Sequence, residues 1–236
     1  MDTKAIPLIM TRPAPANARF VAALPDALRQ RMEVIESPLM QITAVGEGCD
    51  LGPEDGAVFT SANGVSFAPA GAGRFAFCVG HRTTEMALNA GWQAHFCGET
   101  ADALVTHLIQ SPPRRPLVHF SGRHTRGAVA ERLQDANITA ARQVVYDQIL
   151  IPPTSAAQAL IESENPVLVP LFSPRAAAWF AQLYPAGGPI HAMALSPAVA
   201  APLRDLRLLS LDTAARPDAA AMIDCLEKVV QRVSLG

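Results

Sequence analysis

The chain has 236 residues, half of them hydrophobic, which is enough for one large domain or two small ones with substantial cores. Its 19 basic and 21 acidic residues give a formal net charge of −2 without any block of like charge. This balance argues against nucleic acid or an anionic membrane as a partner. The sequence contains no signal-peptide pattern and no apolar run near the ~20 residues that span a bilayer.

The four cysteines are not spaced for metal binding or for redox chemistry. Cys49, Cys78, Cys97 and Cys225 form no C-x-x-C pair and stand near no histidine in a zinc pattern. We therefore expect reduced, mostly buried thiols in a cytoplasmic protein. Because GxGxxG, GxxxxGK[ST] and HExxH motifs are also absent from the sequence, we expect no metal and no nucleotide cofactor.

Strands and helices are predicted to alternate along the chain. Short apolar runs typical of strands occupy 8–10, 32–35, 38–45, 58–59, 75–79, 94–97, 117–120, 141–150, 167–172, 190–195 and 206–211. Helices are predicted to follow most of these strands and to end near residues 28, 68, 90, 109, 133, 161, 183, 203 and 233. This alternation predicts an α/β protein with parallel sheets covered on both faces.

The segment Ala57–Val65 combines a short buried strand with a polar turn that starts a helix. Thr60, Ser61 and Asn63 are residue types that accept hydrogen bonds from the free N–H groups at a helix start. Gly64 lets the backbone approach a neighbouring group closely. Such a turn is either an ordinary capped helix start or, through its backbone donors and hydroxyls, an anion site.

A similar strand and turn return at 168–176, where Phe172, Ser173 and Pro174 take the corresponding places. The surrounding elements recur in the same order in two pairs of ranges, namely 8–42 with 117–149 and 57–110 with 167–233. Taken alone, this repeat predicts two similar small doubly wound domains that face each other, with strand-to-helix turns lining the space between them.

In their order and spacing, several short motifs resemble the uroporphyrinogen-III synthase family over essentially the whole chain. These motifs are Thr11-Arg12-Pro13, Ser37-Pro38-Leu39, Phe59-Thr60-Ser61-Ala62-Asn63-Gly64-Val65, Val79-Gly80 with Thr83, Gly122, Val145-Tyr146 and Phe172-Ser173-Pro174. The resemblance implies two discontinuous domains of the flavodoxin or Rossmann type, joined by two antiparallel linker strands. Domain 1 is then expected at 1–37 and 152–236, domain 2 at 45–145, and the linkers at 38–44 and 146–151.

The resemblance also implies a reaction that needs no cofactor. Hydroxymethylbilane, a linear tetrapyrrole, loses its hydroxyl group and cyclises with inversion of ring D to uroporphyrinogen III, on the route to haem, sirohaem or cobalamin. The main task of the protein is then to position a flexible reactive intermediate. We expect a cytoplasmic monomer, with possible hand-over of the substrate from the preceding deaminase.

Tyr146 occupies the position of the family's tyrosine, so the resemblance makes it the candidate acid that assists departure of the hydroxyl. The alternative is a half-buried strand tyrosine without a catalytic role. Candidate substrate-binding residues are those of the turns, namely Arg12, Thr60, Ser61, Asn63, Gly80, Thr83, Gly122, Arg123 and Ser173. Their hydroxyls, backbone N–H groups and guanidinium groups suit carboxylates, although helix capping and ion pairing explain the same residue types.

Two further observations bear on function. No histidine lies near Thr60 or Ser61 in the sequence, so neither hydroxyl is expected to act as a nucleophile. The segment Leu195–Val199 lacks the hydroxyls that the family pattern places at Ala198 and Val199. This departure keeps a degenerate family member open as an alternative, and the two-lobed architecture keeps open a non-catalytic cytoplasmic ligand-binding protein.

Overall fold

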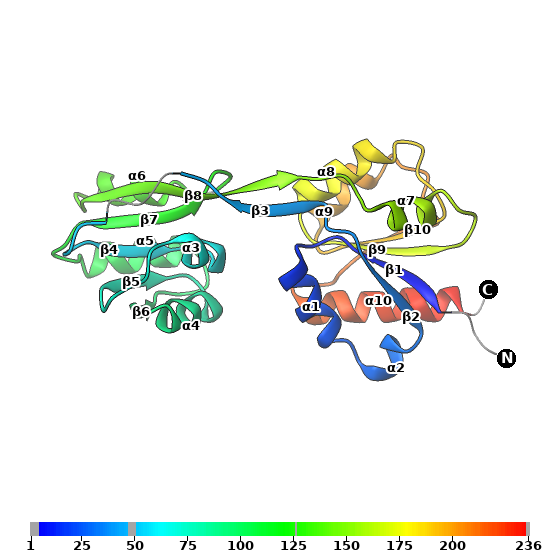
Figure 1. The fold of residues 1–236 in the computed structure, drawn as a ribbon, viewed down its shortest axis with the longest axis horizontal. Helices are drawn as coiled ribbons and strands as arrows, with labels where there is room; N and C mark the ends of the chain where they lie inside the picture. The colour runs from blue at the N-terminus through cyan, green and yellow to red at the C-terminus, as the bar shows by residue number, and fades with distance from the viewer. Residues whose placement is uncertain (1–4, 47–50, 126, 235–236) are drawn as a thin grey trace. The chain divides into compact units, whose positions relative to one another are not determined.

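The computed structural model describes residues 5–46, 51–125 and 127–234. The chain divides into two compact units, unit 1 at Met1–Gln41 with Leu150–Gly236 and unit 2 at Ile42–Ile149. Each unit is built on a mostly parallel sheet with helices between successive strands (Figure 1). The prediction of an α/β fold with two parallel sheets is therefore confirmed.

Unit 1 contains a five-stranded parallel sheet in the order β11-β10-β9-β1-β2. Its strands are β1 (Ile6–Met10), β2 (Met32–Glu36), β9 (Val167–Leu171), β10 (Ile190–Ala194) and β11 (Ser210–Thr213). Its helices are α1 (Ala14–Ala22), α2 (Asp26–Arg29), α7 (Ser155–Ile161), α8 (Pro174–Leu183), α9 (Pro197–Ala200), the 3₁₀ turn η1 (Ala201–Leu203) and α10 (Ala219–Val233).

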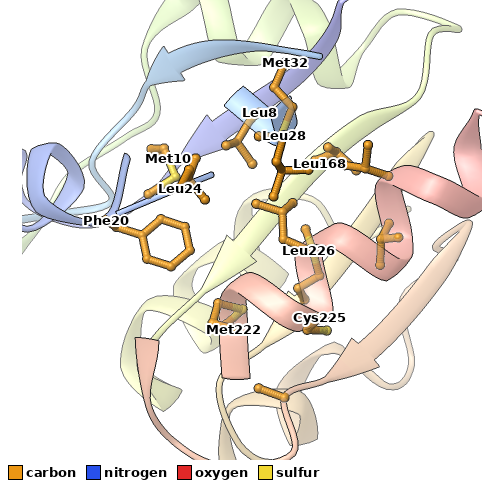
Figure 2. Packing of buried hydrophobic residues seen from close by; sticks show 14 of the residues in the cluster. Leu8, Met10, Phe20, Leu24, Leu28, Met32, Leu168, Met222, Cys225 and Leu226 are labelled. Atoms are coloured by element: carbon orange, nitrogen blue, oxygen red, sulfur yellow. The ribbon is translucent and has the colours of Figure 1, made fainter. Parts of the chain in front are cut away.

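The core of unit 1 has two halves because side chains alternate between the two faces of each strand. Leu8 and Met10 pack with α1 and α10 on one face, whereas Ile9 packs with α7 and α8 on the other. Helix α10 contributes its buried stripe of Met222, Leu226 and neighbouring apolar residues to the first half (Figure 2). Both faces of the sheet are covered, as the continuous apolar runs of its strands predict.

Unit 2 contains a six-stranded sheet in the order β3-β8-β7-β4-β5-β6. Its strands are β3 (Met40–Ala44), β4 (Gly56–Phe59), β5 (Phe75–Cys78), β6 (Gln93–Phe96), β7 (Leu117–Gly122) and β8 (Ala140–Leu150), of which β3 and β8 cross the boundary between the units. Its helices are α3 (Ala62–Phe67), α4 (His81–Asn89), α5 (Ala101–Gln110) and α6 (Val129–Asp135).

The two sheets share one topology, apart from β3. The order β2-β1-β9-β10-β11 in unit 1 corresponds to the order β8-β7-β4-β5-β6 in unit 2. The sheet of unit 1 thus combines strands of 8–42 with strands of 167–233. The sheet of unit 2 combines strands of 117–149 with strands of 57–110. Strand β3 joins the second sheet antiparallel to β8, since Val45 N–H donates to Val145 O and Ile151 N–H donates to Leu39 O.

Two predicted elements are displaced in the structure. The helix predicted to follow strand 117–120 and to end near residue 133 begins only at Val129, because Gly127 and Ala128 have left-handed backbone angles that a helix excludes. The strand predicted at 206–211 lies instead at Ser210–Thr213. Leu206 forms a turn with its N–H donated to Leu203 O, and its apolar side chain packs into the core without being part of a strand.

None of the helices in the described ranges is both long and apolar enough to cross a membrane. Cys78, Cys97 and Cys225 are free and buried, while Cys49 lies outside the described residues. Burial raises the pKa of Cys78 to about 12, so that thiol stays protonated near neutral pH. Among the described residues, no three His, Cys, Asp or Glu side chains are grouped to hold a metal ion.

Candidate functional site

The candidate residues lie where parallel strands end and the next helix begins. In unit 2, Thr60 follows β4, Gly80 follows β5 and Gly122 ends β7, and these three strands are neighbours in the sheet. In unit 1, Arg12 follows β1 and Ser173 follows β9, which are also neighbours. Parallel topology therefore gathers each set at the carboxyl end of its own sheet, where α/β proteins bind ligands.

The β4–α3 turn is a capped helix start with one additional contact. The Ser61 hydroxyl accepts a hydrogen bond from Asn63 N–H at 3.2 Å, which satisfies one free donor of α3. Gly64 lies so close to β7 that a Cβ there would be 2.6 Å from Phe120 O, so only glycine fits. Thr60 Oγ1 lies 3.1 Å from His119 Nε2.

His119 is a site residue that we did not predict from the sequence. It pairs with Val58 in the β4–β7 register, two residues before Thr60, and only 2% of its surface is exposed. Burial, and then the positive charge of Arg142, lower the pKa of His119 to about 4, so its ring is neutral at pH 7. A histidine therefore lies next to Thr60 in the structure, although none lies near Thr60 in the sequence. The available sequence signal was a histidine inside the apolar run LVHF.

The imidazole of His119 has a further polar atom that is unsatisfied. Its Nδ1 is buried and has no hydrogen-bond partner among the residues that the structure describes. With Nε2 beside Thr60 and no charge at neutral pH, the ring orients the Thr60 hydroxyl. Either group of this contact is the donor, depending on the tautomer of the ring, and the arrangement does not include a third group of the kind that activates a nucleophile.

The β5–α4 turn contributes a backbone site and a hydroxyl. Gly80 is the residue before α4 and has a φ of +78°, a conformation that suits glycine. The Thr84 hydroxyl donates back to Gly80 O at 3.1 Å, which fixes the first turn of the helix. Thr83 is 6% exposed, and its hydroxyl forms no hydrogen bond within the described part of the chain.

Tyr146 is held by the end of β7. Its ring is 6% exposed and stacks on Phe67 with ring centroids 5.9 Å apart. Gly122 lies against the other part of the ring, where a Cβ would be 2.5 Å from Tyr146 Cε2. The Tyr146 hydroxyl forms no hydrogen bond with any described residue, and it is not fully enclosed. The ring is thus fixed while its hydroxyl stays available.

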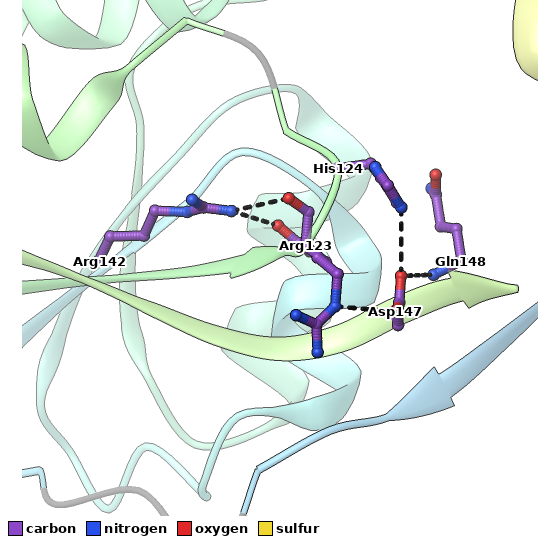
Figure 3. Close-up of polar contacts among 6 residues, drawn as sticks. Arg123, His124, Arg142, Asp147 and Gln148 are labelled. Atoms are coloured by element: carbon purple, nitrogen blue, oxygen red, sulfur yellow. Dashed lines mark hydrogen bonds and ion pairs between the residues drawn. The ribbon is translucent and has the colours of Figure 1, made fainter.

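Arg123 belongs to a cluster with His124 and Asp147, the residue that follows Tyr146 in β8 (Figure 3). Its Nε lies 2.9 Å from Asp147 Oδ2, and His124 Nε2 lies 3.6 Å from Asp147 Oδ1. Partial burial disfavours the Asp147 carboxylate. The Gln148 N–H and the Arg123 guanidinium outweigh that effect and hold its pKa below the usual value.

Arg142 of β8 is a second residue that the sequence did not reveal. Its Nε donates to Ser121 Oγ at 2.9 Å, and its Nη2 donates to Gly122 O at 2.8 Å and to Arg123 O at 3.0 Å (Figure 3). The guanidinium therefore binds three consecutive residues at the end of β7. No pattern within the strand AARQVVYDQIL distinguishes this arginine from an ordinary surface residue.

Several polar groups in the turns of unit 1 have partners within the protein, whereas Arg175 Nη1 is buried without a hydrogen-bond partner among the described residues. The Arg12 guanidinium lies over the Phe172 ring, 4.5 Å from its centroid, and Arg12 N–H donates to the buried Asn17 Oδ1. Thr11 Oγ1 donates to Pro170 O at 2.8 Å, which ties the β1–α1 turn to β9. The Ser173 hydroxyl caps α8 by accepting from Ala176 N–H at 3.1 Å.

The third turn of unit 1 has little polar chemistry. Ser196 precedes the four-residue helix α9 but does not cap it with its side chain. Ala198 is exposed and Val199 is buried, so neither supplies a hydroxyl. The structure therefore brings together Arg12 with the Ser173 turn in unit 1, and Gly122 and Arg123 with Tyr146 in unit 2.

A comparison with protein families matches residues 6–224 to the family described as Uroporphyrinogen-III synthase HemD. The solved structure of uroporphyrinogen-III synthetase from Helicobacter pylori 26695 has a TM-score of 0.65 at 14% identity, covering 98% of this chain and 100% of that chain. A mutant uroporphyrinogen III synthase from the extremely thermophilic bacterium Thermus thermophilus gives a TM-score of 0.48 at 13% identity, with 97% and 100% covered. A search of curated proteins finds no match.

Proposed function

Because the chain belongs to the uroporphyrinogen-III synthase family, whose members are enzymes of tetrapyrrole synthesis, we propose that it converts hydroxymethylbilane to uroporphyrinogen III. The observation that carries the proposal is the family match over residues 6–224. The reaction is a cyclisation with loss of water, so the enzyme is a lyase, and it needs no cofactor.

The proposed chemistry begins at the hydroxymethyl carbon of ring A. The C–O bond breaks, the hydroxyl leaves as water after gaining a proton, and an azafulvene remains. The substituted α-carbon of ring D attacks this electrophile and forms a spiro intermediate. The bond from that carbon to the ring C bridge then breaks and re-forms at the other α-carbon, and loss of a proton restores the pyrrole with ring D inverted.

Tyr146 is proposed to assist the first step by donating a hydrogen bond to the departing hydroxyl. Support comes from its unpartnered hydroxyl and from the contacts of its ring with Phe67 and Gly122, which fix the position of the ring. A phenol is a poor general acid at pH 7, so hydrogen bonding rather than full proton transfer is its role.

The turns are proposed to bind substrate carboxylates. Hydroxyls and backbone N–H groups at helix starts favour anions, which explains how a chain with so even a charge balance accommodates a polyanionic substrate. The groups proposed are those of Arg12 and Ser173 in unit 1 and of Thr60, Ser61, Asn63, Gly80, Thr83, Gly122 and Arg123 in unit 2. Several weak contacts then position the intermediate, and positioning is the larger part of catalysis here.

The test is the isomer composition of the product. Freshly prepared hydroxymethylbilane is incubated with the protein, and the uroporphyrin isomers are separated after oxidation. We expect isomer III to predominate, whereas the control without protein yields isomer I. A ratio of III to I equal to that control would refute the proposed activity and favour a binding protein or a degenerate family member.

We also propose that the enzyme acts as a cytoplasmic monomer that receives its substrate from the preceding deaminase. The basis is chemical, because the free bilane closes spontaneously to isomer I and rapid transfer limits that loss. Light scattering after size exclusion tests the monomer, and cell fractionation tests the location. For hand-over, the isomer ratio of the coupled reaction should stay constant on dilution, whereas free diffusion predicts a falling share of isomer III.

A further inference from the structure

On the basis of the function proposed above, we propose that Arg142 is the positioning residue that holds the end of β7 so that Gly122 seats the ring of Tyr146. Arg142 lies on the same strand as Tyr146 and reaches the turn from one side (Figure 3). It is separate from the turn residues that bind substrate, because its hydrogen bonds are directed to protein atoms.

The end of β7 needs such a residue because its pairing with β8 is interrupted. The register shifts between Ser121 and Gly122, so that Ser121 pairs with Val144 but Gly122 pairs with Tyr146. A bulge of this kind leaves backbone groups without their regular ladder partners. Arg142 donates to the carbonyl oxygens of Gly122 and Arg123 there, at 2.8 and 3.0 Å. The planar guanidinium fixes both carbonyls and the Ser121 hydroxyl at once, which a lysine does not reproduce.

The same bulge determines the position of the tyrosine. Gly122 is in contact with the ring, and Arg123 N–H donates to Tyr146 O at 2.9 Å. A displacement of the Gly122 backbone would therefore change the space available to the Tyr146 ring and so the position of the ring. Because hydrogen bonding to a leaving group depends on sub-ångström placement, a loosened seat lowers kcat more than it weakens binding.

Asp147 holds the other side of the turn through Arg123 and His124. The turn is thus clamped between Arg142 and Asp147, two residues of β8 that flank Tyr146 along the strand. Arg142 itself is exposed, and exposed polar contacts contribute little to the free energy of unfolding. Its expected contribution is therefore to geometry, and its removal should be separable from unfolding.

The test compares Arg142→Ala with Arg115→Ala as a matched control. Arg115 is another arginine of unit 2 with about half of its side chain exposed, and it pairs with Glu54 at 2.7 Å. We expect Arg142→Ala to lower kcat by at least about tenfold with little change in KM, which corresponds to a misplaced catalytic group. Arg115→Ala should keep the wild-type kcat, and both variants should have similar midpoints of unfolding.

Two further measurements exclude a merely structural role. Methylguanidinium added at millimolar concentration should restore part of the activity of Arg142→Ala, whereas Arg142→Lys should stay impaired. In the Tyr146→Phe background, Arg142→Ala should cause little additional loss, because both changes remove the same interaction. Independent, multiplicative losses or an unchanged kcat in Arg142→Ala would overturn the proposal.

Amide hydrogen exchange separates this proposal from the proposed activity. The amides of Gly122 and Arg123 should exchange faster in Arg142→Ala than in the wild type and Arg115→Ala, whatever reaction the protein catalyses. Unchanged exchange at these amides would refute the positioning role even if the synthase activity is found. Faster exchange in a protein that yields only isomer I would instead refute the activity and keep the structural link between Arg142 and the turn.

Discussion

Ser61 and Ser173 each cap a helix that follows a buried strand, the first in unit 2 and the second in unit 1. Around Ser173 several polar groups are engaged, with Arg12 over Phe172 and Thr11 bonded to Pro170 O, while the buried Arg175 Nη1 has no hydrogen-bond partner among the described residues. Around Ser61 the neighbouring strands add a buried histidine beside Thr60 and, at the end of β7, a tyrosine with an unpartnered hydroxyl.

A repeated turn therefore does not imply a repeated chemistry. The cap depends on residues within a few positions of the serine, so both copies retain it. The groups with reactive potential, His119 and Tyr146, come from β7 and β8 and have no equivalent in β1 and β2 of unit 1. We therefore propose that the reacting groups belong to unit 2 and that the turns of unit 1 bind substrate.

The largest expected effect is the pH dependence that His119 gives to unit 2. Its pKa in the folded protein is about 4, below the usual 6.5, so the unfolded chain binds more protons between these values. The contribution of His119 to the free energy of unfolding is therefore fully present above pH 6.5. It is lost as the pH drops towards 4, which lowers the free energy of unfolding by at most about 3 kcal/mol. Urea unfolding at pH 7 and pH 4.5 measures this loss.

The variant His119→Gln should show a smaller loss between the two pH values, while the exposed His95→Gln should keep the wild-type slope. Glutamine retains a hydrogen-bonding partner for Thr60 but does not titrate. Parallel slopes for the wild type and His119→Gln would contradict the interpretation of His119 as a buried neutral group.

A smaller effect is expected from Gly122→Ala. The added methyl group would meet the Tyr146 ring at 2.5 Å, so overpacking should cost about 1–3 kcal/mol of unfolding free energy and displace the ring. Activity should fall in the folded variant as well. Gly56→Ala is the control, because the closest approach of its methyl group would be to the side-chain end of Leu117 at 3.0 Å, with Phe75 O next at 3.4 Å. Equal stability and activity in the two variants would show that the Tyr146 ring is not closely packed against Gly122.

The smallest effect concerns unit 1. Arg12→Ala should raise KM by about 3–10-fold and leave kcat unchanged, since a partly exposed ionic contact contributes about 1 kcal/mol. Arg29→Ala, which removes an exposed arginine paired with Asp26, serves as the control. Steady-state kinetics with fresh bilane measure both constants. A fall in kcat for Arg12→Ala would place reacting chemistry in unit 1 and end the contrast between the units.

Much of the fold was predictable from the order of elements. Short apolar runs bounded by glycine, proline and capping residues indicated nearly all the strands, and the repeat anticipated two sheets of one topology. The pairing of Leu8 with Leu168 was not readable from the residues, because strand partners so far apart leave no local pattern. The resemblance to a family supplied that connection.

The site was less predictable than the fold. Sequence spacing indicated the capped turns, since a cap and its helix are neighbours in the chain. His119 and Arg142 were missed because they act across the sheet, on Thr60 and on the end of β7. The histidine within the apolar run LVHF is visible in the sequence, but its partner is found only once the strand order is known.

The central claim is that the reacting group lies in unit 2 and that the turns of unit 1 bind substrate carboxylates. Its most direct test is a comparison of kcat and KM for Tyr146→Phe and Ser173→Ala, measured well below their unfolding temperatures. We predict that Tyr146→Phe lowers kcat about 100-fold at nearly constant KM, and that Ser173→Ala raises KM at nearly constant kcat. A wild-type kcat in Tyr146→Phe would contradict the claim.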